Sequence, residues 1–250
     1  MKLNVIYNED CLATMQRMQN NFIDLTVTSP PYDNLKTYNG FTFDYKNVIH
    51  ELYRITKDGG IVVWVVSDET KKGSESGSSF EQALYFIKTG FKLHDTMIWH
   101  KPDCFNFGSN KCYRSSFEYM FVFCKGKIKT FNLIKDISTK NAGKVCSGAR
   151  KKNDGSRDQV PSFKVQKYKK RDNVWKISTA KKNFGHPAVF PEELVNGHVI
   201  TWSNTGDIVY DPFMGSGTTA KSALINKRNF IGSEISKLYC DIAKKRLEGI

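Results

Sequence analysis

The sequence lacks any long hydrophobic run. No stretch reaches the 18 or so apolar residues that a membrane-spanning helix needs. The first residues, MKLNVIYNEDC, have no apolar segment followed by a small-residue cleavage site, so no secretory leader is expected. We therefore expect a cytoplasmic protein, associated with the nucleoid in a prokaryote, with no membrane partner.

The six cysteines also lack a recognisable pattern. None of them forms a C-x-x-C pair, and none belongs to a Cys/His cluster at zinc spacing. We expect reduced thiols in or near the core and no metal site.

Acidic residues are scarce in one segment, 125–182. It holds 18 Lys and Arg against four acidic residues, whereas the rest of the chain holds 20 basic and 21 acidic residues. The net charge of +13 is therefore concentrated in this segment. A solvated basic loop would explain it, but localised positive charge favours a surface that binds a polyanion. We expect residues 141–158 to be unordered without nucleic acid.

The rest of the chain alternates between strand and helix patterns. The expected strands are 3–7, 24–28, 61–66, 94–100, 117–126, 207–213 and 229–234, and the expected helices are 12–18, 44–56, 80–88, 190–203, 218–226 and 237–247. The run 61–66 is continuously apolar, as in a strand covered on both faces. The alternation predicts an α/β fold with a doubly wound, mostly parallel sheet.

A turn of small residues lies between the strand at 207–213 and the next helix. Gly215-x-Gly217-x-x-Ala220 fits a loose nucleotide-binding fingerprint, in which small residues let the backbone approach a ligand. Glu234 ends the next strand, at a spacing suited to ribose hydroxyls. Only 16 residues follow Glu234, so the remaining strands must come from the N-terminal half. This permuted order disfavours a nicotinamide oxidoreductase.

A second unusual turn, Ser29-Pro30-Pro31-Tyr32, follows the strand at 24–28. The Ser29 hydroxyl and the Pro30 carbonyl can accept hydrogen bonds from an exocyclic amino group, which helps that nitrogen to release its lone pair. Pro31 stiffens the turn, so the acceptors are preorganised. Tyr32 offers a ring on which a base that has left the duplex can stack.

Together, TSPPY, DPFMGSGTT and GSE resemble the motifs of the β-class of amino-group DNA methyltransferases, in which the catalytic motif precedes the cofactor motif. The resemblance covers nearly all of the chain outside the basic segment. It implies a circularly permuted, seven-stranded, Rossmann-like methyltransferase sheet. It also implies direct methyl transfer from S-adenosylmethionine to a flipped base, as in restriction-modification systems.

The resemblance also assigns individual residues. The implied catalytic residues are Ser29, Pro30, Pro31 and Tyr32, and the implied cofactor-binding residues are Asp10, Cys11, Thr28, His186, Pro187, Asp211, Pro212, Phe213, Gly215, Ser216, Gly217, Thr218, Thr219 and Glu234. One departure is Glu9, where the family often has glycine.

The target base is open between two amino groups. In the family that the chain resembles, serine at the first motif position is commoner among N4-cytosine enzymes and aspartate among N6-adenine enzymes, so the resemblance favours N4 of cytosine, although the same acceptors could hold either amine. Methylation of carbon 5 of cytosine would require an attacking cysteine, in that family within a Pro-Cys pair, and none of the seven prolines precedes a cysteine. RNA and protein glutamine are alternative substrates, although the glutamine enzymes carry their N-P-P-Y motif after the cofactor motif. A non-catalytic nucleic-acid-binding protein on the same frame is a more distant alternative.

We expect 1–124 and 183–250 to form the catalytic and cofactor-binding domain and 125–182 to form a target-recognition region for double-stranded DNA. The expected DNA-binding residues are Arg150, Lys151, Lys152, Arg157, Lys167, Lys169, Lys170 and Arg171. Lysines suit phosphate contacts, and arginines suit the edges of guanine. A cognate restriction endonuclease is a candidate partner, and both a monomer and a homodimer are open.

Overall fold

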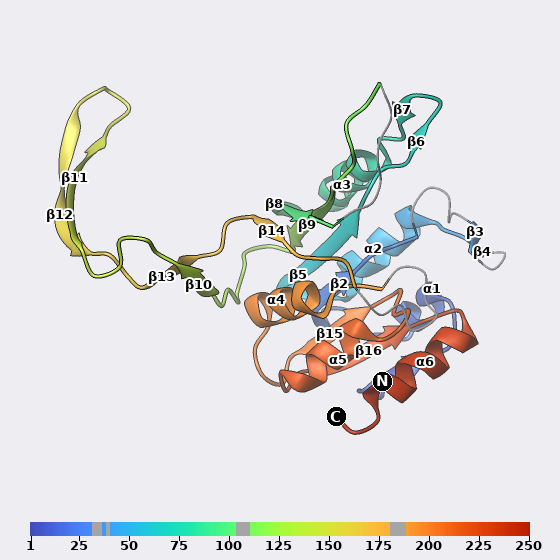
Figure 1. Ribbon diagram of the computed structural model, residues 1–250. Helices are drawn as coiled ribbons and strands as arrows, with labels where there is room; N and C mark the ends of the chain where they lie inside the picture. Colours follow the sequence, from blue (N-terminus) through green and yellow to red (C-terminus); the bar gives the residue numbers. More distant parts are fainter. Residues whose placement is uncertain (32–36, 39–40, 104–110, 181–188) are drawn as a thin grey trace. The chain divides into compact units, whose positions relative to one another are not determined.

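The structure, a computed structural model, describes residues 1–31, 37–38, 41–103, 111–180 and 189–250 (Figure 1). It divides into a large unit, Met1–Asn132 with Asn173–Ile250, and a small unit, Leu133–Asp172. None of the helices in the described ranges is both long and apolar enough to span a membrane.

The large unit is built on an eight-stranded sheet with the order β1-β16-β15-β2-β5-β9-β8-β14. The strands are β1 (Val5–Tyr7), β2 (Ile23–Thr28), β5 (Thr56–Val66), β8 (Lys92–His100), β9 (Phe117–Cys124), β14 (Val174–Lys176), β15 (Ile208–Asp211) and β16 (Asn229–Ser233). Among these described strands, every pairing is parallel except the two that β9 makes. The predicted α/β fold with a mostly parallel sheet is confirmed.

The predicted number of seven strands is wrong by one. The extra strand is β14, which comes from the basic segment and pairs in parallel with β8. Its Trp175 is buried and stacks on His198, with ring centroids 4.6 Å apart. Backbone pairing with β8 and the burial of Trp175 and Ile177 hold this short strand, and no periodic pattern accompanies it in the sequence.

Helices cover both faces of the sheet (Figure 1). The helices α1 (Cys11–Gln16), α2 (Tyr45–Ile55) and α3 (Ser78–Thr89) pack in one core, and α4 (Glu192–Trp202), α5 (Thr218–Ile225) and α6 (Lys237–Leu247) pack in the other. In β5, Val62 and Trp64 face the first core, whereas Ile61 and Val63 face the second. The apolar run at 61–66 is therefore covered on both faces, as predicted.

Local signals explain where the helices begin and end. The Asp44 carboxylate accepts a hydrogen bond from the Asn47 N–H at 3.2 Å and caps α2, whose apolar residues recur at helical spacing. The helix α3 ends at Gly90, whose φ of 118° suits glycine. Two short hairpins, β3–β4 (Thr37–Tyr38 with Phe41–Thr42) and β6–β7 (Thr70–Lys71 with Ser74–Glu75), complete the large unit.

The small unit consists of antiparallel strand pairs. The strand β10 (Lys135–Ser138) pairs with β13 (Tyr168–Lys170), and β11 (Val145–Lys151) pairs with β12 (Arg157–Lys164). The expectation that 141–158 is unordered is therefore wrong, because β11 lies inside this range and β12 begins in it. Cross-strand backbone hydrogen bonds order this ribbon without the apolar pattern from which a strand is predicted.

Both ends of the basic segment 125–182 belong to the large unit rather than to the small one. The Lys125 ammonium donates to the carbonyl oxygens of Tyr53 and Thr56 at 2.7 and 3.0 Å. A charge count along the sequence cannot separate such a structural lysine from one that faces solvent.

Candidate active site

The two predicted motifs meet at the end of the sheet where its parallel strands have their carboxyl ends. The strands β2 and β15 are neighbours and run in parallel, with Leu25 opposite Val209 and Thr26 opposite Tyr210. Because carboxyl ends of adjacent parallel strands lie side by side, the Ser29–Pro31 turn after β2 lies beside the glycine turn after β15. In that turn Ser29 is half-buried and Pro30 is buried.

A buried carboxylate joins the two motifs directly. Asp211 Oδ1 accepts hydrogen bonds from Thr28 Oγ1 at 2.6 Å and from the Phe213 N–H at 3.0 Å. Its Oδ2 accepts from Thr219 Oγ1 at 2.7 Å. Asp211 is 2% exposed, and burial raises its pKa to about 6, against the lowering effect of the hydrogen bonds from Thr28 and Thr219. The Asp211 carboxylate therefore fixes the end of β2 against the start of α5.

The glycine turn adopts a backbone conformation that favours glycine. Gly215 and Gly217 have φ angles of 51° and 83°. A Cβ on Gly217 would also lie 2.9 Å from the Cβ of Ala243 in α6, so α6 packs directly against the turn. No side chain caps α5 at Gly217. This explains the glycine at the second fingerprint position by strain and by close packing.

Glu234 follows β16, next to the glycine turn. Its Oε2 accepts from the Gly215 N–H and its Oε1 from the Ser236 N–H, both at 2.8 Å. The side chain is largely buried, and burial raises its pKa. The Asn8 side-chain amide donates to the Glu234 carbonyl at 2.9 Å and ties the end of β1 to this position. The predicted ribose ligand therefore lies beside the predicted cofactor turn.

The segment after β1 contributes Asp10 and Cys11. Asp10 Oδ1 accepts from the Leu12 N–H at 2.8 Å and caps α1, and Cys11 is buried, which raises the pKa of its thiol. The unusual Glu9 accepts a hydrogen bond from Thr14 Oγ1 at 2.6 Å and pairs with Arg17, which lowers the pKa of Glu9. Glu9 thus has an internal role in fixing α1.

The other predicted cofactor residues, Pro212, Ser216 and Thr218, are all buried in or beside the glycine turn. Three predicted site residues, Tyr32, His186 and Pro187, lie outside the residues that the structure describes.

Arg246 in α6 contacts the glycine turn of the candidate site, a contact that the sequence did not reveal. Its Nη1 donates to the Ser216 carbonyl at 2.6 Å, to Ser216 Oγ at 2.8 Å and to Thr218 Oγ1 at 3.3 Å. Its Nη2 lies 3.1 Å from Glu192 Oε1 in α4. Burial lowers the pKa of this guanidinium. Arg246 thus fixes the glycine turn through contacts from α6. In the sequence it is only one of several basic residues in the last turn of a helix, so nothing marks it out.

The predicted DNA-binding residues all lie in the small unit, where some have internal partners. Arg171 donates through Nε to Asp136 Oδ2 at 2.9 Å, and Lys152 Nζ lies 2.7 Å from Asp158 Oδ1. The Arg171 guanidinium lowers the pKa of Asp136. Arg171 therefore braces β10 within the unit, a contact that competes with the predicted reading of guanine.

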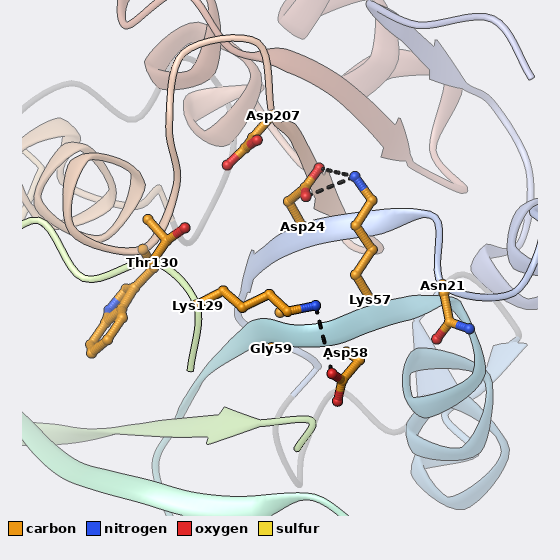
Figure 2. Close-up of a pocket in the computed structure, with 10 residues that line it drawn as sticks. Asn21, Asp24, Lys57, Asp58, Gly59, Lys129, Thr130 and Asp207 are labelled. Carbon is orange, nitrogen blue, oxygen red and sulfur yellow. Dashed lines mark hydrogen bonds and ion pairs between the residues drawn. The ribbon is translucent and has the colours of Figure 1, made fainter. Parts of the chain in front are cut away.

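A hollow of about 320 Å³ lies at the opposite end of the sheet, at the amino ends of the strands β2 and β5 (Figure 2). Figure 2 shows the ion pairs Lys57–Asp24 and Lys129–Asp58 at this hollow. Asp24 Oδ2 also accepts from the Ile208 N–H at 2.9 Å. These contacts fasten the starts of three strands, and the hollow is separate from the site at their carboxyl ends.

Comparisons with known proteins agree with this geometry. The sequence model of the N6/N4 DNA methylase family matches residues 23–245. The orphan methyltransferase M.BamHII of Bacillus amyloliquefaciens is 53% identical over 90% of this chain and 89% of its own length. The type II methyltransferase M.BglII of Bacillus subtilis is 29% identical over 99% of this chain and 69% of its own length.

Solved structures share the fold. The cytosine-N4-specific PvuII DNA methyltransferase has a TM-score of 0.72 and 20% identity over 98% of this chain and 87% of its own. A complex of M1.HpyAVI with SAM has a TM-score of 0.64 and 24% identity over 97% of this chain and 98% of its own. The chain therefore belongs to the N6/N4 amino-group DNA methyltransferase family.

Proposed function

We propose that this protein transfers a methyl group from S-adenosylmethionine to an exocyclic amino group of a base in double-stranded DNA, and that the target is N4 of cytosine rather than N6 of adenine. The observation that carries the proposal is the contact between Thr28 and Asp211, which joins the Ser29–Pro31 turn to the glycine turn. Serine at position 29 is the feature that favours cytosine.

The residues around the glycine turn carry chemical groups that are suited to bind S-adenosylmethionine. Glu234 offers carboxylate oxygens to which ribose hydroxyls can donate, and Asp10, which follows the neighbouring strand β1, is expected beside the adenine. The backbone at Gly215 and Gly217 carries no side chain that would keep a ligand away. When bound, the cofactor supplies an electrophilic methyl group. Arg246 holds the turn in place from the other side.

The turn after β2 positions the nucleophile. The Ser29 hydroxyl and the Pro30 carbonyl accept hydrogen bonds from the amino group, which localises the nitrogen lone pair and orients it. These acceptors would hold the two N–H bonds while the bound cofactor would supply the methyl group, and the proton lost by the nitrogen would pass to water. Orientation of this kind corresponds to effective molarities of about 10⁵–10⁸ M in well-aligned reactions.

The base must leave the duplex before it reaches this turn. Flipping costs a few kcal/mol, and stacking on Tyr32 and hydrogen bonds to Ser29 and Pro30 offset this cost. A methyltransferase that acts without a covalent intermediate needs no enzyme thiolate, and the raised pKa of buried Cys11 keeps that thiol protonated.

We further propose that the small unit, within the basic segment 125–182, is the target-recognition region. Its lysines supply phosphate contacts that fix the position of the duplex. The remainder forms the methyltransferase domain, whose motif order corresponds to a circular permutation of the sheet connections. Because the substrate is cellular DNA, the protein acts in the cytoplasm.

The similarity to M.BamHII, which is described as orphan, supports a protein that works without a partner endonuclease. Deleting the gene in its host tests this point. Normal viability of the deletion strain is expected, whereas death from cleavage of unmodified DNA would show that a partner endonuclease exists.

The transfer itself is tested by incubating the purified protein with labelled cofactor and duplex DNA. Incorporation of label into DNA is expected, and Ser29→Ala should lose it while keeping cofactor affinity in calorimetry. Ser74→Ala, in the exposed strand β7, is the matched control and should keep both. Label in RNA or in the protein instead of DNA would contradict the proposal.

A further inference from the structure

The ribbon formed by β11 and β12 has no core of its own. None of the residues in these two strands, all of which the structure describes, is buried. Val145 and Phe163 are 71% and 55% exposed. A two-stranded ribbon alone is marginally stable in water, so a surface uncovered on both sides suits an element that binds a partner.

The register assigns each side chain near the turn of the ribbon to one of two faces. Arg150 pairs with Asp158, and the adjacent pair is Lys151 with Arg157. Because successive side chains point to opposite sides of a strand, these two pairs lie on opposite faces. We call them the Asp158 face (Arg150, Asp158, Gly148, Val160) and the Gln159 face (Lys151, Arg157, Ala149, Gln159).

The two faces differ in charge. The Gln159 face carries Lys151 and Arg157 and no acidic residue, and no hydrogen bond or ion pair engages these two side chains within the described part of the chain. The Asp158 face carries a carboxylate that would repel phosphate. Lys152, the next residue on this face, binds Asp158 at 2.7 Å, which is consistent with the alternation. Both faces carry basic residues, but of the two only the Gln159 face has no carboxylate among its side chains.

Given the proposed function, on which this inference rests, we propose that the Gln159 face lies in the major groove of the target DNA and that Arg157 and Gln159 determine its sequence specificity. The major groove, about 12 Å wide, admits a two-stranded ribbon. Arginine pairs in bidentate fashion with guanine and glutamine with adenine. Arg150, on the other face, is excluded from this role.

The spacing of Arg157 and Gln159 along β12 matches the spacing of base pairs along the duplex. Residues two apart on a strand are about 6.6–6.8 Å apart, close to the rise of two base pairs at about 3.4 Å each. Ala149 stands directly opposite Gln159, so a small side chain leaves the amide free to approach a base edge. Lys151, opposite Arg157, is placed to contact a phosphate.

The test begins with the cognate site, which is identified by sequencing methylated DNA from cells that express the wild-type protein. Methylation rates are then measured on a duplex with this site and on duplexes with one base pair changed. Arg157→Ala and Gln159→Ala should each lower the discrimination at one position by roughly 5- to 100-fold.

Arg150→Ala is the matched control, because it removes the same charge from the same ribbon. It should leave every discrimination ratio within about twofold of the wild-type value. Cofactor affinity, measured by calorimetry, should be unchanged in all three variants. The inference would be overturned if Arg150→Ala relaxed the specificity, or if Arg157→Ala and Gln159→Ala left it unchanged. Loss of cofactor binding in Arg157→Ala or Gln159→Ala would also overturn it. A wild-type protein that methylates no DNA would refute the proposed function itself.

Discussion

Asp211 allows the sharpest perturbation of the link between the two motifs. Removing its carboxylate in Asp211→Ala leaves Thr28 Oγ1 and the Phe213 N–H without their acceptor in a buried region. Thr219 Oγ1 has a second acceptor, the Val27 carbonyl at 3.4 Å. Two orphaned donors at about 1–3 kcal/mol each should make Asp211→Ala about 2–6 kcal/mol less stable than Asp211→Asn.

Asp211→Asn should be more stable than the wild type at neutral pH. The folded state raises the pKa of Asp211 from 3.8 to about 6, so folding favours the proton and the wild type loses stability as pH rises through this range. The loss amounts to roughly 2 kcal/mol at pH 5 and roughly 3 kcal/mol at pH 8. Asparagine resembles the protonated acid and escapes this loss.

The assay is urea unfolding of the wild type and the two variants at pH 5 and pH 8. The advantage of Asp211→Asn over the wild type should grow by roughly 1 kcal/mol between pH 5 and pH 8. In Asp211→Asn, the amide oxygen still accepts the hydrogen bonds from Thr28 Oγ1 and the Phe213 N–H, and the NH₂ group can donate to Thr219 Oγ1. Methyl transfer should therefore survive in this variant. A less stable Asp211→Asn at pH 8, or loss of cofactor binding in it, would refute the role of Asp211 as an internal brace.

Three further predictions concern the turn, its support and the small unit. Gly217→Ala should lose cofactor affinity in calorimetry, because φ is 83° and the new Cβ would lie 2.9 Å from that of Ala243; wild-type affinity would show that the turn can shift at no cost. Arg246→Met should weaken cofactor binding roughly 10-fold or more, since buried charged hydrogen bonds contribute about 1.5–3 kcal/mol each, and an unchanged dissociation constant would mean that the turn needs no support from α6. DNA affinity should fall steeply with salt, with a log–log slope of about −0.9 per phosphate contact, and Lys167→Ala should reduce this slope by about 1; binding that ignores salt would contradict the phosphate contacts.

The sequence points to a candidate site because the proposed chemistry depends on unusual local residues. The serine–proline turn and the glycine turn are recognisable without neighbours, and the strand pattern places both at carboxyl ends. Their adjacency follows once β2 and β15 pair, which the order of motifs required. Glu234 was singled out by its spacing, and the structure places its carboxylate against the Gly215 N–H.

Other features depend on tertiary contacts that leave no local pattern. Arg246 looks like any other arginine in a basic helix end, yet it holds Ser216 across the fold. The strand β14 pairs with β8 and is packed by the buried Trp175 within a charged segment. The ribbon of β11 and β12 was missed because exposed strands need no apolar alternation, and charge alone could not tell Arg150 from Arg157.

The most direct test of the central claim is analysis of nucleosides from duplex DNA that has been methylated by the purified protein. Digestion and mass spectrometry should find the methyl group on an exocyclic nitrogen, as N4-methylcytosine. Adding a thiol to the reaction of the wild-type protein should not increase the amount of this product. The appearance of 5-methylcytosine, or of no methylated base although the cofactor binds, would contradict the account.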